Sequence, residues 1–252
     1  MRRFFVEEIN ERDGQTVISG AEARHILKVL RMGKGDHFIL MDGKGNRHEA
    51  VIESSRHKEL LVRLERPLPP PSVSPVKIIL CQALLKSRAM DYLIEKASEL
   101  GVNAIIPFSS ERTVIRLNEN RAANRAKHWR EVAQNAAKQS DRMKPAKIFL
   151  PISFKELMGK REHDDSIKVI LWEKEESKDL KEILRDSSSL TKFIGIVGPE
   201  GGFSKEEINT AKEAGFTPVS MGRRILRAET AAITLVAIIQ YELGDLGFTD
   251  VI

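Results

Sequence analysis

The chain has little material for covalent or metal cross-links, because its 252 residues include a single cysteine, Cys81. One cysteine cannot close an intramolecular disulfide or supply a cysteine-based zinc site. Cys81 lies in an apolar run, so we expect it to be buried as a small hydrophobic residue. The longest apolar stretch, residues 231–239, is too short to span a bilayer, and residues 1–7 contain no apolar leader. We therefore expect a soluble, cytoplasmic protein.

Charge of one sign is also scarce, because 41 basic residues stand against 36 acidic ones and the net charge is +5. The excess is concentrated, since residues 111–147 hold ten basic and four acidic side chains. A local basic excess is typical of a surface that binds a phosphate backbone. A solvated basic helix face gives the same pattern, so charge alone leaves both interpretations open.

Proline is sparse except in one segment, residues 67–75, which holds five of the ten prolines. Proline fixes φ and removes a hydrogen-bond donor, so this segment is expected to be a stiff extended spacer. It divides the chain into a domain of residues 1–72 and a domain of residues 73–252. The first contains short alternating segments and one amphipathic helix, at about residues 21–30. This pattern predicts a small, compact β-barrel.

The second domain alternates apolar strands with helical segments, which predicts an α/β fold with a mostly parallel sheet. Its first helix has apolar residues at helical spacing from Met90 to Leu100, and Gly101 follows as a cap. Ser204 and Glu207 form a capping box at the start of another helix. The last helix, at about residues 229–243, is apolar almost all round, so we expect it in the core or in a subunit interface.

A first candidate ligand loop lies at the end of the buried strand expected at residues 193–198 and reads Gly-Pro-Glu-Gly-Gly over residues 198–202. Glycines allow a close approach of the backbone to a ligand, and the helix after Ser204 begins with free amides. The loop has neither the Lys-Ser/Thr of a P-loop nor the spacing of a dinucleotide fingerprint. It therefore predicts a small-molecule loop without identifying the molecule, and a tight strand–helix turn is the alternative.

A second candidate loop covers residues 220–231, where Gly222 turns the chain and Ile225 and Leu226 stand among basic residues. The two apolar side chains are suited to flank a planar base. They are equally suited to fill the core, and the sequence does not choose between the two. Thr230 is a candidate N-cap of the last helix.

Together these loops resemble the SPOUT class of methyltransferases, and in particular the RsmE family. The resemblance extends over nearly the whole chain. It includes residues 3–6, 25–31, 95–102, 111–113 and 129–131, together with Gln134 and residues 139–140. It implies an N-terminal PUA-like β-barrel that binds RNA, and a SPOUT domain that ends in a trefoil knot and dimerises through the knot region. The implied activity is methylation of N3 of uridine 1498 in 16S ribosomal RNA, on the free RNA or the assembled small subunit.

The resemblance also implies a site for S-adenosylmethionine, the methyl donor, with no metal. The residues it assigns to the cofactor are Leu171, Trp172, Glu173, Val197, Gly198, Pro199, Glu200, Gly201, Gly202, Ser220, Met221, Gly222, Ile225, Leu226, Arg227, Thr230 and Ala231.

Catalysis at N3 requires removal of its proton and stabilisation of the resulting anion. Arg227 is the candidate for stabilising the anion, Arg112 of the opposite subunit is a second, and Glu229 is the candidate proton acceptor. A carboxylate that merely complements a helix N-terminus is the alternative for Glu229. The candidate RNA contacts are Arg3, Arg24, Lys28, Arg31, Arg112, Arg116 and Arg130.

Three other functions are compatible with parts of this pattern. The nearest is a SPOUT enzyme with a different target, such as a ribose 2′-hydroxyl. A non-catalytic RNA-binding or ribosome-assembly factor is the second. A nucleotide-binding α/β enzyme is the third, and the missing phosphate fingerprint disfavours it.

Overall fold

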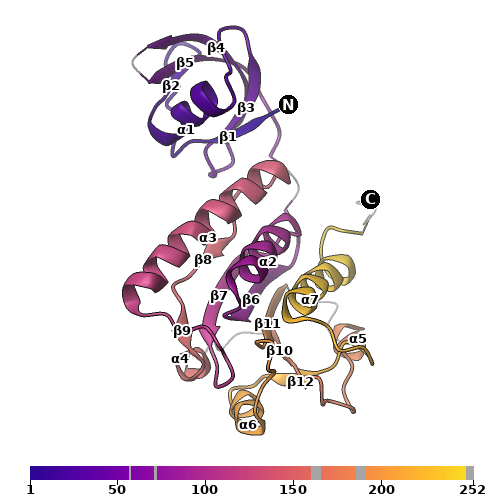
Figure 1. Ribbon diagram of the computed structural model, residues 1–252. Coiled ribbons are helices and arrows are strands. Elements are labelled where there is room, and N and C mark those ends of the chain that lie inside the picture. The colour runs from indigo at the N-terminus through magenta and orange to yellow at the C-terminus, as the bar shows by residue number, and fades with distance from the viewer. Residues whose placement is uncertain (57, 71–72, 160–165, 186–190, 248–252) are drawn as a thin grey trace. The chain divides into compact units, whose positions relative to one another are not determined.

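A computed structural model of the chain describes residues 1–56, 58–70, 73–159, 166–185 and 191–247 (Figure 1). The chain forms two compact units. The first contains Met1–Ser72 and also Ala137–Lys144, and the second contains Val73–Ala136 and Pro145–Ile252. Part of the proline-rich spacer, residues 71–72, lies outside the described residues. No described helix is long and apolar enough to cross a membrane.

The first unit is a five-stranded mixed sheet with a short helical segment. Its strands are β1 (Arg3–Phe5), β2 (Gln15–Ile18), β3 (His37–Met41), β4 (Arg47–Arg56) and β5 (Glu59–Pro67), and they pair in the order β1-β3-β4-β5-β2. The pairing of β1 with β3 is parallel and the others are antiparallel. The helix expected at residues 21–30 is two pieces, an α-helix α1 (Gly20–Arg24) and a π-helix η1 (His25–Val29).

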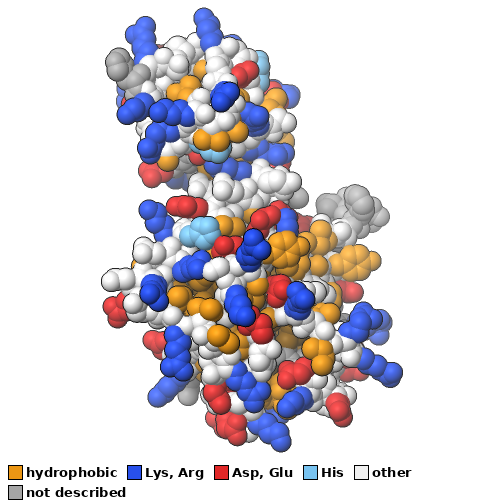
Figure 2. Space-filling view, viewed as in Figure 1, with side chains coloured by type: hydrophobic (Ala, Val, Ile, Leu, Met, Phe, Trp, Pro, Cys, Tyr) orange, Lys and Arg blue, Asp and Glu red, His pale blue; other side chains and the backbone are white. Residues whose placement is uncertain are grey.

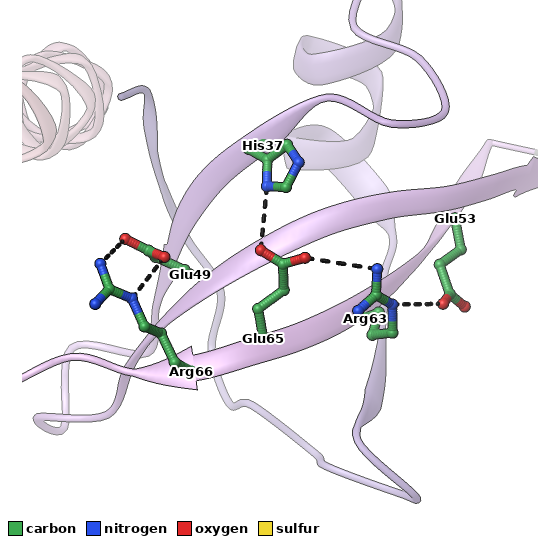
Figure 3. A network of polar contacts seen from close by, with 6 residues as sticks. All are labelled: His37, Glu49, Glu53, Arg63, Glu65 and Arg66. Atoms are coloured by element: carbon green, nitrogen blue, oxygen red, sulfur yellow. Dashed lines mark hydrogen bonds and ion pairs between the residues drawn. The ribbon is translucent and has the colours of Figure 1, made fainter.

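Alternation along the strands of the first unit gives it a buried and an exposed face. Phe38 and Leu40 of β3 are fully buried in a core with Ile26. Polar side chains lie on β3, β4 and β5, as Figure 3 shows. There Glu65 contacts His37 at 3.1 Å and Arg63 at 3.5 Å. Exposed pairs of this kind contribute little to stability, so the apolar core dominates.

Residues 137–144 belong with the first unit because several side chains hold them there. Ala137 is buried beside Phe5 and Met41. The carboxylate of Asp141 accepts a hydrogen bond from the nearly buried Arg47 at 2.7 Å and pairs with Arg3 at 2.8 Å. Lys138 donates to Glu22 at 2.6 Å. Because these contacts join distant parts of the sequence, the unit is not continuous along the chain.

The second unit has a parallel sheet of seven strands. They are β6 (Lys77–Ala83), β7 (Ala104–Ser109), β8 (Lys147–Ile148), β9 (Ile152–Ser153), β10 (Ile167–Leu171), β11 (Lys192–Val197) and β12 (Thr217–Val219). The order is β12-β10-β11-β6-β7-β8, with β9 also paired to β7, and every pairing between them is parallel. The helices are α2 (Ser87–Glu99), α3 (Glu119–Gln139), α4 (Phe154–Gly159), α5 (Leu180–Arg185), α6 (Lys205–Glu213) and α7 (Ala228–Glu242).

Two apolar cores cover the two faces of this sheet. One contains residues of α2, α5 and α7, such as Leu93 and Leu235, and the other contains residues of α4 and α6, such as Phe154 and Ile208. Cys81 is 1% exposed in the second core. Because helices cover both faces of the sheet, a ligand is expected to bind where the strands end. In open parallel sheets, ligand sites lie at the carboxyl ends of the strands.

Candidate active site

A large cavity lies at the carboxyl ends of four neighbouring parallel strands, β6, β10, β11 and β12. It has a volume of about 1170 Å³. Three of its walls are the ends of β10, β11 and β12 with the loops that follow them, at residues 171–173, 197–203 and 219–231. All the residues expected to hold a cofactor line it, except Thr230.

Close packing explains the glycine at the start of the first loop. Gly198 is buried, and a Cβ atom placed on it would lie 2.9 Å from the ring of Phe203. Phe203 is 2% exposed and lies parallel to Phe108, with 6.4 Å between the ring centroids. The loop therefore folds tightly onto its own phenylalanine, and there is no room for a side chain at its first position.

The other two glycines approach neighbouring segments. A Cβ on Gly201 would lie 3.1 Å from the Cβ of Arg112, and Arg112 Nη1 donates to the Gly201 carbonyl at 3.0 Å. Gly202 has a φ of +67°, and its Cβ would lie 2.9 Å from a carboxylate oxygen of Glu173. Both a left-handed conformation and a close approach therefore require glycine at residue 202.

The helix after this loop is fixed by the expected capping box. Ser204 accepts from the amide of Glu207 at 3.3 Å, and the Ser204 amide donates to Glu207 Oε2 at 3.0 Å. Glu207 Oε1 accepts from the amide of Glu111 at 2.9 Å. One buried carboxylate therefore joins the loop at residues 198–204 to the segment that carries Arg112.

The second loop presents its apolar side chains to the cavity. Ile225 is 86% exposed and Leu226 is half-buried, and both line the cavity. The interpretation of Ile225 as a core residue is therefore wrong. Gly222 has a φ of +99°, which turns the chain after β12. The expectation that Thr230 caps the last helix is also wrong, because α7 starts at Ala228 with Arg227 at the N-cap and has no side-chain cap.

Two segments far apart in sequence run together behind the cavity. The amide of Ser220 donates to the carbonyl of Lys178 at 3.0 Å, and the amide of Leu180 donates to the carbonyl of Ser220 at 3.2 Å. Ser177 donates from its amide and its hydroxyl to Glu175, and these hydrogen bonds lower the pKa of that carboxyl group. The connection between β10 and α5 is thereby held against the chain leaving β12, in the region where the knot is expected.

The candidate catalytic side chains occupy different positions around the cavity. Arg227 and Glu229 both line it, with Arg227 exposed and Glu229 half-buried in the first turn of α7. Arg112 does not line it but contacts Gly201 of the same chain from outside. Contact within one chain was not expected for Arg112, which was assigned to an opposite subunit.

The candidate RNA contacts are divided between the two units. In the first unit Arg24, Lys28 and Arg31 are exposed on or just after α1 and η1, whereas Arg3 is paired with Asp141. In the second unit the candidates lie apart. Arg116 lines a smaller cavity of about 660 Å³, and Arg130 donates to the Ile148 carbonyl at 3.2 Å. Figure 2 shows Lys and Arg side chains interspersed with Asp and Glu on the face in view.

Sequence reasoning missed several residues of the cavity. Lys86, Arg88 and Tyr92, at the start of α2, form a further wall. Gln82 lies behind the cavity, fully buried, and its Nε2 atom donates to the carbonyls of Ala83 at 3.0 Å and Gly198 at 3.4 Å. The only sequence signal for Gln82 was an amide within an apolar strand.

The comparisons with known proteins agree with this fold. A family model described as an RNA methyltransferase domain matches residues 72–240, and one described as an RNA methyltransferase PUA domain matches residues 18–65. The protein is thus of the RNA methyltransferase class. The α/β fold class expected from the sequence, with a PUA domain before the SPOUT domain, is confirmed.

Individual relatives narrow the class. The ribosomal RNA small subunit methyltransferase E of Mesomycoplasma hyopneumoniae is 32% identical over 93% of this chain and 97% of its own, and that of Bacillus subtilis is 29% identical over 96% and 97%. The crystal structure of the Neisseria gonorrhoeae enzyme of this name, bound to S-adenosyl methionine, has a TM-score of 0.88 at 31% identity, covering 98% of this chain and all of that one. The chain belongs to the ribosomal RNA small subunit methyltransferase E family.

Proposed function

We propose that the protein transfers a methyl group from S-adenosylmethionine to N3 of uridine 1498 of 16S ribosomal RNA. The observation that carries the proposal is the convergence of the expected cofactor residues, Thr230 aside, on one cavity at the carboxyl edge of the sheet. The solved relative from Neisseria gonorrhoeae, whose bound ligand is S-adenosyl methionine, supports the choice of cofactor. A ribosomal substrate also agrees with a cytoplasmic location.

The residues of the cavity fit an adenosyl group. Leu171, Val197 and Leu226 offer apolar surface for a planar base, and the carboxylate of Glu173 offers acceptors for ribose hydroxyls. The glycines at residues 198, 201 and 202 let the loop pack tightly against Phe203, Arg112 and Glu173, which fixes its backbone at the edge of the cavity. When bound, the sulfonium group supplies an already activated methyl group.

The protein's own task is then to position the acceptor nitrogen, exclude water and handle one proton. Glu229 accepts the proton from N3 in this proposal, and Arg227 stabilises the negative charge left on the uracil ring. Their place on the cavity wall, two positions apart at the start of α7, supports a shared role. Arg112 acts indirectly, by holding the carbonyl of Gly201.

Binding of the cofactor and identity of the product are tested separately. Calorimetry with S-adenosylmethionine should show one site per chain, and an absence of binding would favour a non-catalytic assembly factor. Mass analysis of nucleosides from ribosomal RNA, with and without the gene, should show N3-methyluridine appearing with the protein. A ribose-methylated nucleoside in its place would favour the 2′-hydroxyl target.

The role of Arg227 is tested by Arg227→Ala, with Arg223→Ala as a matched control. Arg223 is an exposed arginine of the same loop that does not line the cavity. Arg227→Ala should leave cofactor affinity within a few-fold and reduce methyl transfer by a hundredfold or more, about the loss of one oxyanion donor. Turnover equal to that of the control would contradict the assignment.

For RNA binding we propose the first unit and the basic residues of the second. Exposure of Arg24, Lys28 and Arg31 on neighbouring turns supports contacts to phosphates or to splayed bases. Affinity should fall steeply with salt, and replacement of Lys28 by alanine should reduce the slope by about one. A flat salt dependence would contradict this role. The same assay on free RNA and on isolated small subunits identifies the substrate.

We also propose a homodimer formed through α7 and the knot region. Hydrophobic side chains gather over α7 in Figure 2, and Tyr241 is 67% exposed there. A helix that is apolar on more than its buried face needs a second cover. Light scattering should give twice the mass of the chain, and Tyr241→Asp should shift the mass toward the monomer. A wild-type monomer at micromolar concentration would contradict the proposal.

A further inference from the structure

The cavity is larger than a methyl donor needs, and one of its walls differs in chemistry from the others. Its volume of about 1170 Å³ exceeds the roughly 300–1,000 Å³ typical of a site for one small molecule. A further wall is the start of α2, with Lys86, Arg88, Ala89 and Tyr92. These residues lie more than seventy positions from any loop expected to bind the cofactor, so the chain brings them there through the strand order β6-β11-β10-β12.

Charge is divided between the walls. The walls made by the loops contain three carboxylates, those of Glu173, Glu200 and Glu229, and two cations, Arg224 and Arg227, so carboxylates are in excess there. The α2 wall contains two cations and no carboxylate. A polyanionic ligand that shares this cavity therefore meets its most favourable potential along α2.

The two cations of this wall are not used by the protein itself. Among the described residues, neither Lys86 nor Arg88 makes a side-chain hydrogen bond or an ion pair, and both are exposed. Further along the same helix the situation is different, because Lys96 contacts Glu95 at 2.7 Å and Glu99 at 3.0 Å. The carboxylates of α2 thus neutralise the cation at its far end and leave the two beside the cavity available to a ligand.

Tyr92 adds an aromatic surface to the same wall. It follows Arg88 by four positions, so both side chains lie on one side of α2. The ring is 52% exposed although tyrosine is normally buried in part against the protein. Lys96 Nζ lies 6.0 Å from the centroid of the ring. An exposed ring on the same side of a helix as unpaired cations is the combination with which proteins hold an unstacked nucleotide, with the base on the ring and the phosphate on the cations.

We propose that Lys86, Arg88 and Tyr92 form the subsite for the target nucleotide of the RNA. Its base stacks on Tyr92 and faces Arg227 and Glu229 across the cavity, and Lys86 and Arg88 bind the adjoining phosphates. This assignment rests on the proposed methyltransferase function and adds the substrate side of that same site. It explains why one cavity has two chemically different halves.

The test compares Lys86→Ala, Arg88→Ala, Tyr92→Ala and Tyr92→Phe with the control Lys155→Ala, an exposed lysine of α4 that lines neither described cavity. Each protein is assayed for S-adenosylmethionine affinity by calorimetry, for methylation kinetics on RNA and for mass by light scattering. All three side chains are exposed or at the surface, so the variants are expected to fold.

Cofactor affinity should stay within twofold in every variant. The KM for RNA should rise about three- to tenfold in Lys86→Ala and Arg88→Ala, with a salt slope smaller by about one for each lost cation. In Tyr92→Ala kcat/KM should fall about tenfold or more, the range for loss of one stacking contact, and Tyr92→Phe should restore it. Lys155→Ala should behave as the wild type.

Three results would overturn the subsite. One is normal RNA kinetics in Tyr92→Ala and in both cation variants. Another is a loss of cofactor affinity equal to the loss of kcat/KM, which would assign these residues to the methyl donor. The third is conversion of Tyr92→Ala to a monomer, which would assign the ring to a subunit contact. Failure of the wild type to bind S-adenosylmethionine would instead refute the proposed function itself.

Discussion

Replacement of Gly198 by alanine probes the tightest contact of the first ligand loop. The new Cβ would lie 2.9 Å from Cε2 of Phe203, 3.2 Å from Cδ2 and 3.3 Å from Cζ. Gly198 does not have a positive φ, so the conflict is one of packing and not of backbone conformation. Relief requires either the loop or the phenylalanine ring to move.

The ring has little freedom to move. Phe203 is 2% exposed, with Phe108 stacked on it at 6.4 Å and Phe154 tilted against it at 5.9 Å. Inserting a methyl group into such packing costs about 1–3 kcal/mol. We expect Gly198→Ala to lower the free energy of unfolding by that amount and to weaken S-adenosylmethionine about tenfold, because the loop carrying Pro199 and Glu200 is displaced.

Urea unfolding and calorimetry measure the two effects, and Gly159→Ala is the matched control. Gly159 ends α4 with an ordinary φ and no heavy atom within 4 Å of an added Cβ. In a double variant, Phe203→Leu should recover part of the cofactor affinity lost in Gly198→Ala, since it shortens the opposing side chain. If Gly198→Ala matches the control in stability and affinity, or if the two changes are strictly additive, the reasoning fails.

Three further predictions concern polar groups. Gln82→Met removes the hydrogen bond to the Gly198 carbonyl and should weaken the binding of S-adenosylmethionine about fivefold, the value of one hydrogen bond. The control Gln240→Met, at another fully buried glutamine that does not line the cavity, should leave this affinity unchanged. Equal affinities in the two variants would refute the role of Gln82. Asp141→Asn should destabilise the first unit by about 1 kcal/mol in urea, because the nearly buried Arg47 keeps its charge beside a neutral partner; an unchanged midpoint would contradict this. Burial alone would raise the pKa of Asp42, but hydrogen bonds from the Asn46 side chain and two amides outweigh it and lower the pKa. Its stabilising contribution is therefore present above its usual pKa of 3.8 and is lost as the pH falls through the lower folded value, so the stability of Asp42→Asn should change less than that of the wild type between pH 5 and pH 2.

Local sequence determined much of the fold and the loops of the site. The short alternating segments of residues 1–72 predict strands, and β3 (His37–Met41) is one of those that the structure contains. The spacing of Ser204 and Glu207 predicts a capping box that is present. Patterns of this kind succeed because neighbours along the chain carry the whole interaction. They gave a small β domain followed by an α/β domain, and glycine loops at strand ends.

Errors arose where a local pattern admits two geometries. The apolar spacing at residues 21–30 fits a single α-helix as well as it fits the α1 and η1 segments. An α-helix and a π-helix differ in which carbonyl each amide reaches. In η1 the amide of Leu30 donates to the carbonyl of His25, five positions earlier, at 3.0 Å. Thr230 is a good capping residue by type, but α7 begins two positions earlier. The helix start is decided by where the chain leaves the loop at residues 220–227.

Other features depend on contacts between distant parts of the chain, and only the tertiary structure decided them. Residues 137–144 join the first unit because Asp141 meets Arg47 across more than ninety positions. Arg88 and Tyr92 reach the cavity because β6 lies beside β11 in the sheet. The sequence by itself determined the two ligand loops, since their glycines and capping residues act on adjacent backbone. It did not determine which helix faces those loops, because that follows from strand order, which no short-range pattern encodes.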